Sequence, residues 1–345
     1  MHQTQMQHRG VGRRSMVALW GLGLLEAAVA QSAAPLLQSS AAGKREERSV
    51  AQWLERMHEA SRSRNYIGTL VVSSNTGAMS SARIWHACDG QQQLERVESL
   101  TGAPRSTFRR NDEVVTFLPE SRIARTERRE SLGLFPDLLK SNASSIPEFY
   151  AARHIGSDRV AGFAADVVHL IPKDQLRYGY RIWSEKKSGL VVKLQTLDLD
   201  QVVLEQAAFS ELQLDAPVRA DKLSQMMTAT GGWRIEKADT VKCSAAAEGW
   251  QLRATVPGFK PVSCYKRPAG ASREGNMQWI FSDGLAAVSL FVEAYDARRH
   301  QQEGLFASGA TQTLTHRVQD WWLTAVGEAP PQTLMVFAQN LERIK

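Results

Sequence analysis

The chain is poor in cysteine and histidine and has no long apolar run. Its 345 residues contain three cysteines and eight histidines, and no two cysteines have the short spacing of zinc ligands. His86 and Cys88 are near neighbours, but no third ligand is evident in the sequence. No segment reaches the roughly 20 apolar residues that a membrane-spanning helix needs. We therefore expect neither a metal centre nor a membrane span.

Catalytic signatures are also missing. The sequence has no Gly-x-Ser-x-Gly elbow, no His-Glu-x-x-His pair and no glycine-rich phosphate loop before a helix. His58-Glu59 lacks a second histidine four residues on. These absences predict a protein that is not an enzyme and carries no cofactor. A hydrolase assembled from residues far apart in the chain stays open as an alternative.

The N-terminus has the layout of a secretory signal peptide over residues 1–30. A positive start, a short apolar run and a small-residue cleavage site follow in order, at Arg9, Arg13 and Arg14, then residues 16–25, then residues 28–30. We expect cleavage near Ala30 and export of the rest; a twin-arginine signal is the alternative. Residues 31–45, rich in Ala, Ser and Gln, are expected to form a disordered lead-in. Export makes nucleic acid a poor candidate partner.

Three cysteines in an exported chain allow one disulfide and one leftover thiol. Cys243 and Cys264 lie close together within one predicted β region, whereas Cys88 lies in another. We therefore predict a Cys243–Cys264 disulfide and leave the redox state of Cys88 open.

Residues 46–215 are predicted to form one helix followed by a long antiparallel meander. Ser49 and Gln52 form a capping signature at the start of the helix, whose apolar residues share one face. Short alternating segments between turn signals predict strands at 66–73, 82–87, 93–100, 106–110, 113–118, 153–156, 160–171 and 202–214, and a hairpin over 174–198. A short helix is expected near residues 135–137.

The sequence Asp215-Ala216-Pro217 marks a boundary. We expect a linker with a short helical piece over 216–232 and a C-terminal α+β domain over 233–345. Its predicted strands lie at 251–256, 262–267, 277–282, 285–293 and 316–326. A last helix opens at Pro330 and Pro331, since proline fits the first turn of a helix.

The hairpin over 174–198 has a strongly apolar face. One helix cannot cover a meander this long, so the sheet must curl on itself or leave a groove. An apolar groove marks a ligand or partner site. We predict a lipid-binding wall made of Tyr66, Leu70, Trp85, Tyr178, Tyr180, Ile182, Leu190, Val192 and Leu194. Arg177 or Arg181 is expected either at its mouth, for phosphate, or on the surface.

Short segments along nearly the whole mature chain carry a family resemblance. In the first domain they are Trp53-Leu54 with Met57, Tyr66-x-Gly68-Thr69, Arg83 to His86, Leu100-x-Gly102-Ala-Pro-Arg105, Arg159-Val-Ala-Gly162, Asp174-x-x-Arg177-Tyr178-Gly179-Tyr180-x-x-Trp183, Ser188-Gly189-Leu190, and Leu204-Glu205-Gln206 with Phe209. In the second they are Val256-Pro-Gly-Phe259, Phe281-Ser-Asp-Gly-Leu285 and Val326-Gly-Glu-x-Pro-Pro331. In this order they make the chain resemble the RseB and MucB family of periplasmic sigma-E regulatory proteins.

The resemblance implies an α+β fold. Its first domain would be a half-open antiparallel β-barrel with a helical plug, like that of periplasmic lipoprotein carriers, followed by a smaller α+β domain. It also implies a periplasmic negative regulator of the envelope-stress response. Such a protein binds the periplasmic part of a transmembrane anti-sigma factor, shields it from site-one proteolysis, and releases it when lipid or lipopolysaccharide binds.

The resemblance leaves several points open. It assigns no partner-binding residues, does not account for the cysteine pair, and does not fix whether the chain forms a homo-oligomer. The alternative function is a periplasmic lipid or lipoprotein carrier, which would share the barrel domain.

Overall fold

Two antiparallel sheets account for most of the described residues, which in this computed structural model are 48–88, 92–128, 145–237, 241–267 and 276–344. All of them belong to one structural unit over residues 46–345. The expected signal peptide, the lead-in and the short helix near 135–137 lie outside the described residues.

Helix α1 (Val50–Ser63) begins where the capping signature predicts. The Ser49 hydroxyl accepts a hydrogen bond from the Gln52 N–H at 3.2 Å, and the Gln52 side chain accepts one from the Ser49 N–H at 2.8 Å. Both bonds satisfy backbone donors that the first turn would otherwise leave unpaired. The residues that α1 buries are spaced for one face and are Val50, Trp53, Leu54, Met57, Ala60 and Ser61.

The first sheet has twelve strands in the described part of the chain. They are β1 (Tyr66–Ser74), β2 (Met79–Cys88), β3 (Gln93–Ser99), β4 (Ser106–Arg110), β5 (Glu113–Leu118), β6 (Ile123–Arg128), β7 (Tyr150–Val160), β8 (Phe163–Pro172), β9 (Gly179–Glu185), β10 (Val191–Leu197), β11 (Val203–Leu214) and β12 (Arg234–Lys237). Their spatial order is β12-β6-β5-β4-β3-β2-β1-β11-β10-β9-β8-β7. All neighbours are antiparallel except β12, which runs parallel to β6. The edge strands β12 and β7 do not pair with each other, so within the described residues the sheet is open.

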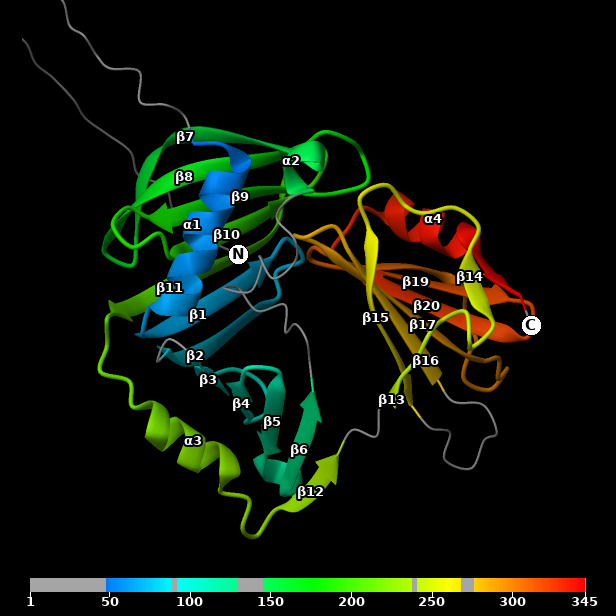
Figure 1. Ribbon diagram of the computed structural model, residues 1–345, viewed down its shortest axis with the longest axis horizontal. Helices are drawn as coiled ribbons and strands as arrows, with labels where there is room; N and C mark the ends of the chain where they lie inside the picture. The colour runs from blue at the N-terminus through cyan, green and yellow to red at the C-terminus, as the bar shows by residue number, and fades with distance from the viewer. Residues whose placement is uncertain (1–47, 89–91, 129–144, 238–240, 268–275, 345) are drawn as a thin grey trace, which may run out of the picture. The chain divides into compact units, whose positions relative to one another are not determined.

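The two faces of this sheet are covered by different helices. Figure 1 shows α1 crossing the face of β8, β9 and β10, where its apolar residues join the largest buried cluster. Helix α3 (Ala220–Thr228) packs elsewhere: Leu223 contacts Ala87 and Leu94, and Met227 joins a cluster with Phe108. Two short turns complete the region, a 3-10 turn at Pro119–Ser121 and α2 (Ile146–Phe149).

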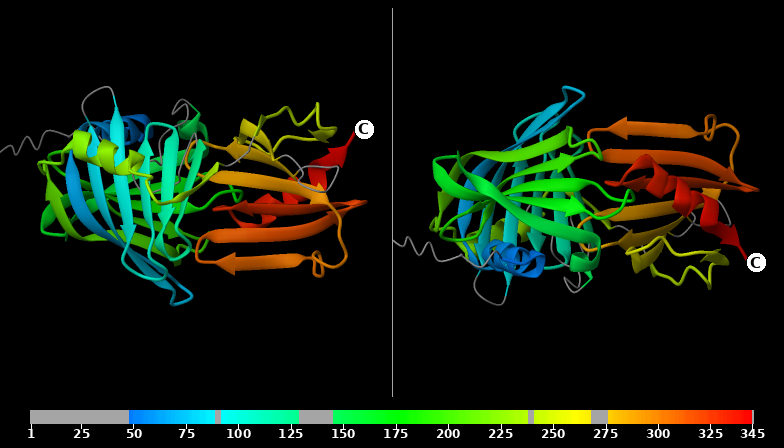
Figure 2. Two further views of the ribbon diagram at one scale, coloured as in Figure 1. Left: turned by 90° about the horizontal axis from the view of Figure 1, so that it is seen from below. Right: turned by 90° about the horizontal axis from the view of Figure 1, so that it is seen from above.

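The second sheet has seven strands in the order β13-β15-β16-β17-β20-β19-β18. They are β13 (Val241–Lys242), β15 (Lys260–Arg267), β16 (Asn276–Ser282), β17 (Ala287–Ala294), β18 (Gly304–Ser308), β19 (Thr311–Val318) and β20 (Trp321–Gly327). Helix α4 (Pro331–Asn340) lies along one face of this sheet (Figure 2) and starts at the proline that predicts it. β14 (Trp250–Leu252) and β21 (Leu341–Arg343) pair separately.

Several predicted strands are wrong in extent. The strand predicted over 160–171 begins only after a turn at Ala161 and Gly162, both of which have positive φ. The gap predicted at 157–159, between two strands, belongs to β7, which pairs with β8 across this turn. The segment 316–326 is likewise two strands, broken at Gln319, whose φ is also positive. The strand predicted at 251–256 shortens to β14, and β18 was not predicted. Edge strands such as β7 and β18 are mostly exposed, so they show little apolar alternation.

The region after residue 215 returns to the first sheet. Helix α3 lies inside the predicted linker over 216–232, and β12 lies just beyond it, yet both pack with β2–β6. The strand order therefore groups residues up to Lys237 with the first sheet.

The predicted disulfide between Cys243 and Cys264 is confirmed. It links the start of the second sheet to β15 across a sequence separation of 21 residues. On the chain-entropy model a loop of this length stabilises the fold by about 3 kcal/mol. Cys88 forms no disulfide with another described cysteine and is partly buried.

Candidate functional site

The nine residues predicted to form a lipid-binding wall do not all lie in one cluster. Six of them lie together in the core beneath α1: Tyr66, Leu70, Tyr180, Ile182, Leu190 and Val192. Leu194 is partly buried and packs against the same cluster. The sheet curvature therefore brings β1, β9 and β10 residues into one apolar surface.

Trp85 and Tyr178 lie elsewhere. Trp85 follows Ile84, which does face the wall, so the two-residue period of the strand turns Trp85 to the opposite face, near α3. There the guanidinium of Arg96 lies 4.6 Å from the ring centre. Tyr178 is buried outside the wall cluster, and its hydroxyl hydrogen-bonds to Gln312 of β19.

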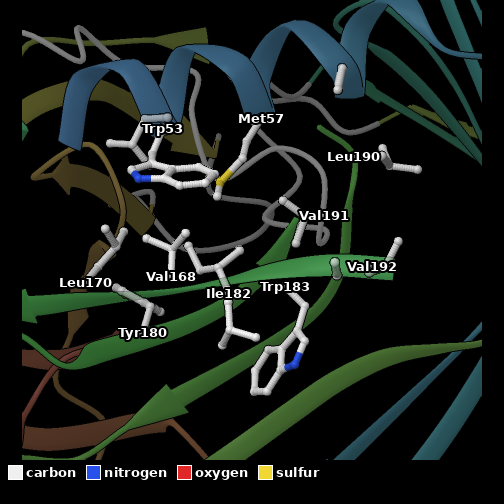
Figure 3. Close-up of a cluster of buried hydrophobic side chains, with 14 of the residues drawn as sticks. Trp53, Met57, Val168, Leu170, Tyr180, Ile182, Trp183, Leu190, Val191 and Val192 are labelled. Carbon is white, nitrogen blue, oxygen red and sulfur yellow. The ribbon is translucent and has the colours of Figure 1, made fainter. Parts of the chain in front are cut away.

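Helix α1 covers the wall. Trp53 and Met57 point from α1 towards the strands that carry Val168 and Ile182 (Figure 3), and both are nearly fully buried. Burying a large apolar side chain stabilises a fold by about 1.5–3 kcal/mol. The wall is therefore part of a packed core in this conformation, with α1 as its lid.

Arg56 links α1 to the end of β9 and the β9–β10 turn through hydrogen bonds. Its guanidinium donates to the Lys186 carbonyl at 2.5 Å and to the Ser184 hydroxyl at 3.2 Å. At Gly189 of the same turn φ is +88°, and an added Cβ would lie 2.9 Å from the Arg56 side chain. Glycine is therefore needed there both for the turn and for the close approach of α1.

Arg177 is neither at a mouth nor on the surface, so both predictions for it are wrong. Its side chain is fully buried, ion-pairs with Asp174, and donates from Nε to Asp283 at 2.9 Å and from Nη2 to the Pro257 carbonyl at 2.5 Å. The ring centres of Phe149 and Phe259 lie 4.3 and 5.3 Å from its guanidinium carbon. Arg181, in contrast, is half-buried and donates to Gln195.

Three segments that carry the family resemblance meet at this arginine. They are the segments around Asp174-x-x-Arg177, Val256-Pro-Gly-Phe259 and Phe281-Ser-Asp-Gly-Leu285. Gly258 has a φ of +79°, and a Cβ there would collide with Arg177. Tyr150 donates to Asp283 at 3.1 Å, and burial raises the pKa of its hydroxyl well above the usual range. We call Tyr150, Asp174, Arg177 and Asp283 the arginine junction.

A pair of carboxyl groups lies between the same two sheets. Burial, together with the smaller effect of the nearby Glu205 carboxylate, raises the pKa of Glu328 to about 7. Burial also raises the pKa of Glu205, while a hydrogen bond from the Ala310 N–H opposes that rise. Gly309 makes room for this contact, because a Cβ there would lie 2.8 Å from the Glu205 carboxylate.

Comparison with known families identifies the fold. The model of the MucB/RseB N-terminal domain matches residues 49–227, and that of the MucB/RseB C-terminal domain matches residues 244–342. The chain belongs to the MucB/RseB family. The resemblance read from short segments is thereby confirmed.

Relatives within the MucB/RseB family are similar over most of their length. Sigma factor AlgU regulatory protein MucB of Pseudomonas aeruginosa is 28% identical over 292 residues, which cover 81% of this chain and 87% of MucB. Sigma-E factor regulatory protein RseB of Escherichia coli K12 is 25% identical over 290 residues, covering 84% of this chain and 89% of RseB. The names are those of regulatory proteins rather than of enzymes.

Solved MucB structures share the fold. The Pseudomonas aeruginosa MucA/MucB complex aligns with a TM-score of 0.66 at 25% identity, over 86% of this chain and 99% of that chain. A second structure, MucB in complex with MucA(peri), aligns with a TM-score of 0.64 at 25% identity, over 85% of this chain and 98% of that chain.

Within the described ranges, no helix of this MucB/RseB protein is long and apolar enough to span a membrane, and no three metal-ligating side chains gather.

Replacing Asp283 with asparagine tests the arginine junction. The amide preserves the shape and the oxygen that accepts from the Leu285 N–H, but it leaves the buried Arg177 charge short of a counter-charge. Loss of one partner of a buried pair costs about 3–5 kcal/mol. We expect D283N to lower the free energy of unfolding in urea by about that amount. D221N, at the exposed Arg219–Asp221 pair, is the matched control and should change little; equal stability of the two variants would contradict the role of the junction.

Glu328 should give the protein a pH-dependent stability of defined sign. Its folded pKa of about 7 lies above the usual 4.5, so the folded state binds the proton more tightly. The stabilisation is complete below pH 4.5 and is lost as the pH rises through 7. It amounts to at most about 3 kcal/mol, because contact of the side chain with water weakens the effect of burial. We expect the urea midpoint of the wild type to decrease as the pH is raised from about 5 to about 8. The decrease should be smaller in E328Q. The control E59Q, on the exposed side of α1, should behave as the wild type does.

Proposed function

We propose that this protein is a periplasmic negative regulator of the envelope-stress response. It binds the periplasmic part of a transmembrane anti-sigma factor and shields it from site-one proteolysis. The observation that carries the proposal is membership of the MucB/RseB family in both domains, together with a relative that was solved in complex with MucA. Two regulatory relatives align over 87% and 89% of their own length, which supports the same assignment.

The proposal includes export through a signal peptide that is cleaved near Ala30. The Cys243–Cys264 disulfide supports it, because disulfides persist in oxidising compartments such as the periplasm. It also includes a division into a first domain over 46–215 and a C-terminal domain over 233–345. The separate buried clusters of the two sheets support two domains, with the strand order favouring a boundary beyond Lys237.

We infer that the first sheet is the half-open barrel of periplasmic carriers, with α1 as its plug. Two observations support this: the edge strands β12 and β7 do not pair with each other in the part of the chain that the structure describes, and α1 is buried against the sheet. Lipid or lipopolysaccharide acyl chains would bind the wall formed by Tyr66, Leu70, Tyr180, Ile182, Leu190, Val192 and Leu194. Since α1 covers the wall, an acyl chain can reach the wall only as α1 lifts and the Arg56 contacts break.

Release of the partner then follows by linkage. A lipid displaces the anti-sigma factor only if it binds the partner-free form more tightly than the partner-bound form. Movement of α1 would supply that difference, because the β9 strand beneath it begins two residues after Arg177 of the arginine junction.

A carrier of lipids or lipoproteins is the second candidate. The apolar wall favours it, since a carrier needs such a surface and little else. The C-terminal sheet, with its own core, is more than a carrier needs. Hand-over of a bound lipid to an outer-membrane acceptor would favour the carrier.

Proteolysis of the partner tests the regulator. The purified periplasmic fragment of the anti-sigma factor is incubated with site-one protease and increasing amounts of this protein. We expect dose-dependent protection, reversed by added lipopolysaccharide and absent with albumin at equal concentration. Unchanged cleavage at saturating concentrations would refute the proposed function.

Photo-crosslinking tests the lipid site. We expect a diazirine fatty acid to label peptides from residues 66–72 and 178–194. R56A should increase that labelling several-fold, because the fastening of α1 is lost, whereas R62A, in the last turn of the same helix, should not. Labelling confined to the C-terminal domain would show that the wall does not bind acyl chains.

A further inference from the structure

Three basic side chains form a row across β7, β8 and β9, on the face of the first sheet that α1 does not cover. The strand register places Arg153 opposite His169, and His169 opposite Arg181. Trp183 shares the face of Arg181, because side chains alternate along a strand. Figure 3 shows Trp183 pointing away from α1. The row therefore lies on the face opposite the apolar wall. We call Arg153, His169 and Arg181 the basic row.

Other arginines of the first sheet have carboxylate partners. Arg83 pairs with Glu211, and Arg110 pairs with Glu113. Within the part of the chain that the structure describes, no Asp or Glu forms an ion pair with a member of the basic row. Basic side chains on directly opposed residues of a sheet repel one another. The fold alone therefore gives no reason for this arrangement.

The basic row has hydrogen-bonding groups to spare. Arg181 donates from Nη1 to the Gln195 side chain at 3.1 Å. Its Nε atom and the Nε2 atom of His169 are buried without a hydrogen-bond partner among the described residues. Such atoms call for an explanation, and a bound ion is one. A ligand has access to the row, because Arg153 is exposed and a Cβ added at the neighbouring Gly156 would meet nothing within 4 Å.

The imidazole of His169 lies between two positive charges. Burial lowers the pKa of His169, and the guanidiniums of Arg181 and Arg153 lower it further. The Gln201 side chain, from the β10–β11 turn, opposes part of this effect. The charged groups that act on the ring are thus the two arginines, one on β7 and one on β9. An anion bound between them would offset both.

A phosphate group matches the chemistry of the basic row. Guanidiniums present forked N–H donors, a geometry that suits the oxygens of phosphate. The imidazolium between them would add a further donor. A carboxylate has fewer oxygens and would satisfy fewer of these donors. A lipid whose acyl chains occupy the wall would have the sheet between its chains and this row, so the two sites are separate.

We propose that Arg153, His169 and Arg181 bind a phosphate group on the outer face of the first sheet. The phosphate belongs either to a soluble compound or to a lipid headgroup at a membrane surface, since both present the same chemistry. The inference goes beyond the proposed function and does not rest on it.

The test is a titration of the full protein with inorganic phosphate, followed by NMR through the imidazole resonance of His169, which H169N assigns. R153Q and R181Q each remove one guanidinium, and each should weaken phosphate binding by at least about tenfold, because a charge-assisted hydrogen bond is lost. R159Q is the matched control, since Arg159 is also exposed on β7 but the register places it on the other face. It should leave the affinity unchanged. Circular dichroism checks that each variant is folded.

Sulfate provides a second readout, because it is a tetrahedral dianion whose own charge does not change over the pH range of the titration. An anion between the two guanidiniums offsets their effect on the imidazole. Sulfate should therefore raise the pKa of His169 relative to chloride at equal ionic strength. A row that is merely structural would not show this difference.

Vesicles identify the source of the phosphate. Binding to phosphatidic acid vesicles but not to phosphatidylcholine vesicles, with loss in R153Q, supports the site and assigns it to headgroups. Phosphate binding without vesicle binding supports the site and assigns it to a soluble compound. The inference is overturned if the wild type does not bind phosphate, if R153Q and R159Q lose affinity equally, or if chloride changes the pKa of His169 as much as sulfate does. None of these results would affect the proposed function.

Discussion

The buried charge of Arg177 is the constraint on which the contact between the two sheets depends. A guanidinium stays protonated at any pH the protein meets, so burial obliges the fold to surround it with acceptors. Asp174 is local, but the Pro257 carbonyl and Asp283 come from segments 80 and 106 residues away. The arginine therefore ties the start of β9 to two loops of the C-terminal sheet. A glycine at position 258 is part of the same requirement, because any side chain there would occupy the space of the guanidinium.

Local patterns predicted the parts of the fold that local physics decides. The capping box of α1, the apolar stripe on its inner face, most strands and the Cys243–Cys264 bond all followed from short stretches of sequence. Two strand boundaries failed at turns that use a non-glycine residue with positive φ, Ala161 and Gln319. At the first, Gly162 offered a turn signal, but the predicted strand ran through it. The family resemblance supplied the long-range architecture that periodicity could not.

The candidate sites were only partly predictable for the same reason. Alternation brought six wall residues together, but Trp85 was included for its size although its parity places it on the other face. Arg177 looks like an ordinary strand arginine, since nothing near it in sequence reveals partners so far away. The carboxyl groups of Glu205 and Glu328 lie in two segments that carry the family resemblance, but no local pattern indicates that the fold removes both from water.

The burial of α1 sets the energetic cost of uncovering the apolar wall. Uncovering the wall exposes Val50, Trp53, Leu54 and Met57, at a cost of about 6–12 kcal/mol, which is comparable to the whole stability of a typical domain. In the proposed function a lipid would therefore have to replace the helix contacts as they break, and its binding should be slow. A regulator of this kind would respond to lipid only when enough acyl surface is present to displace α1.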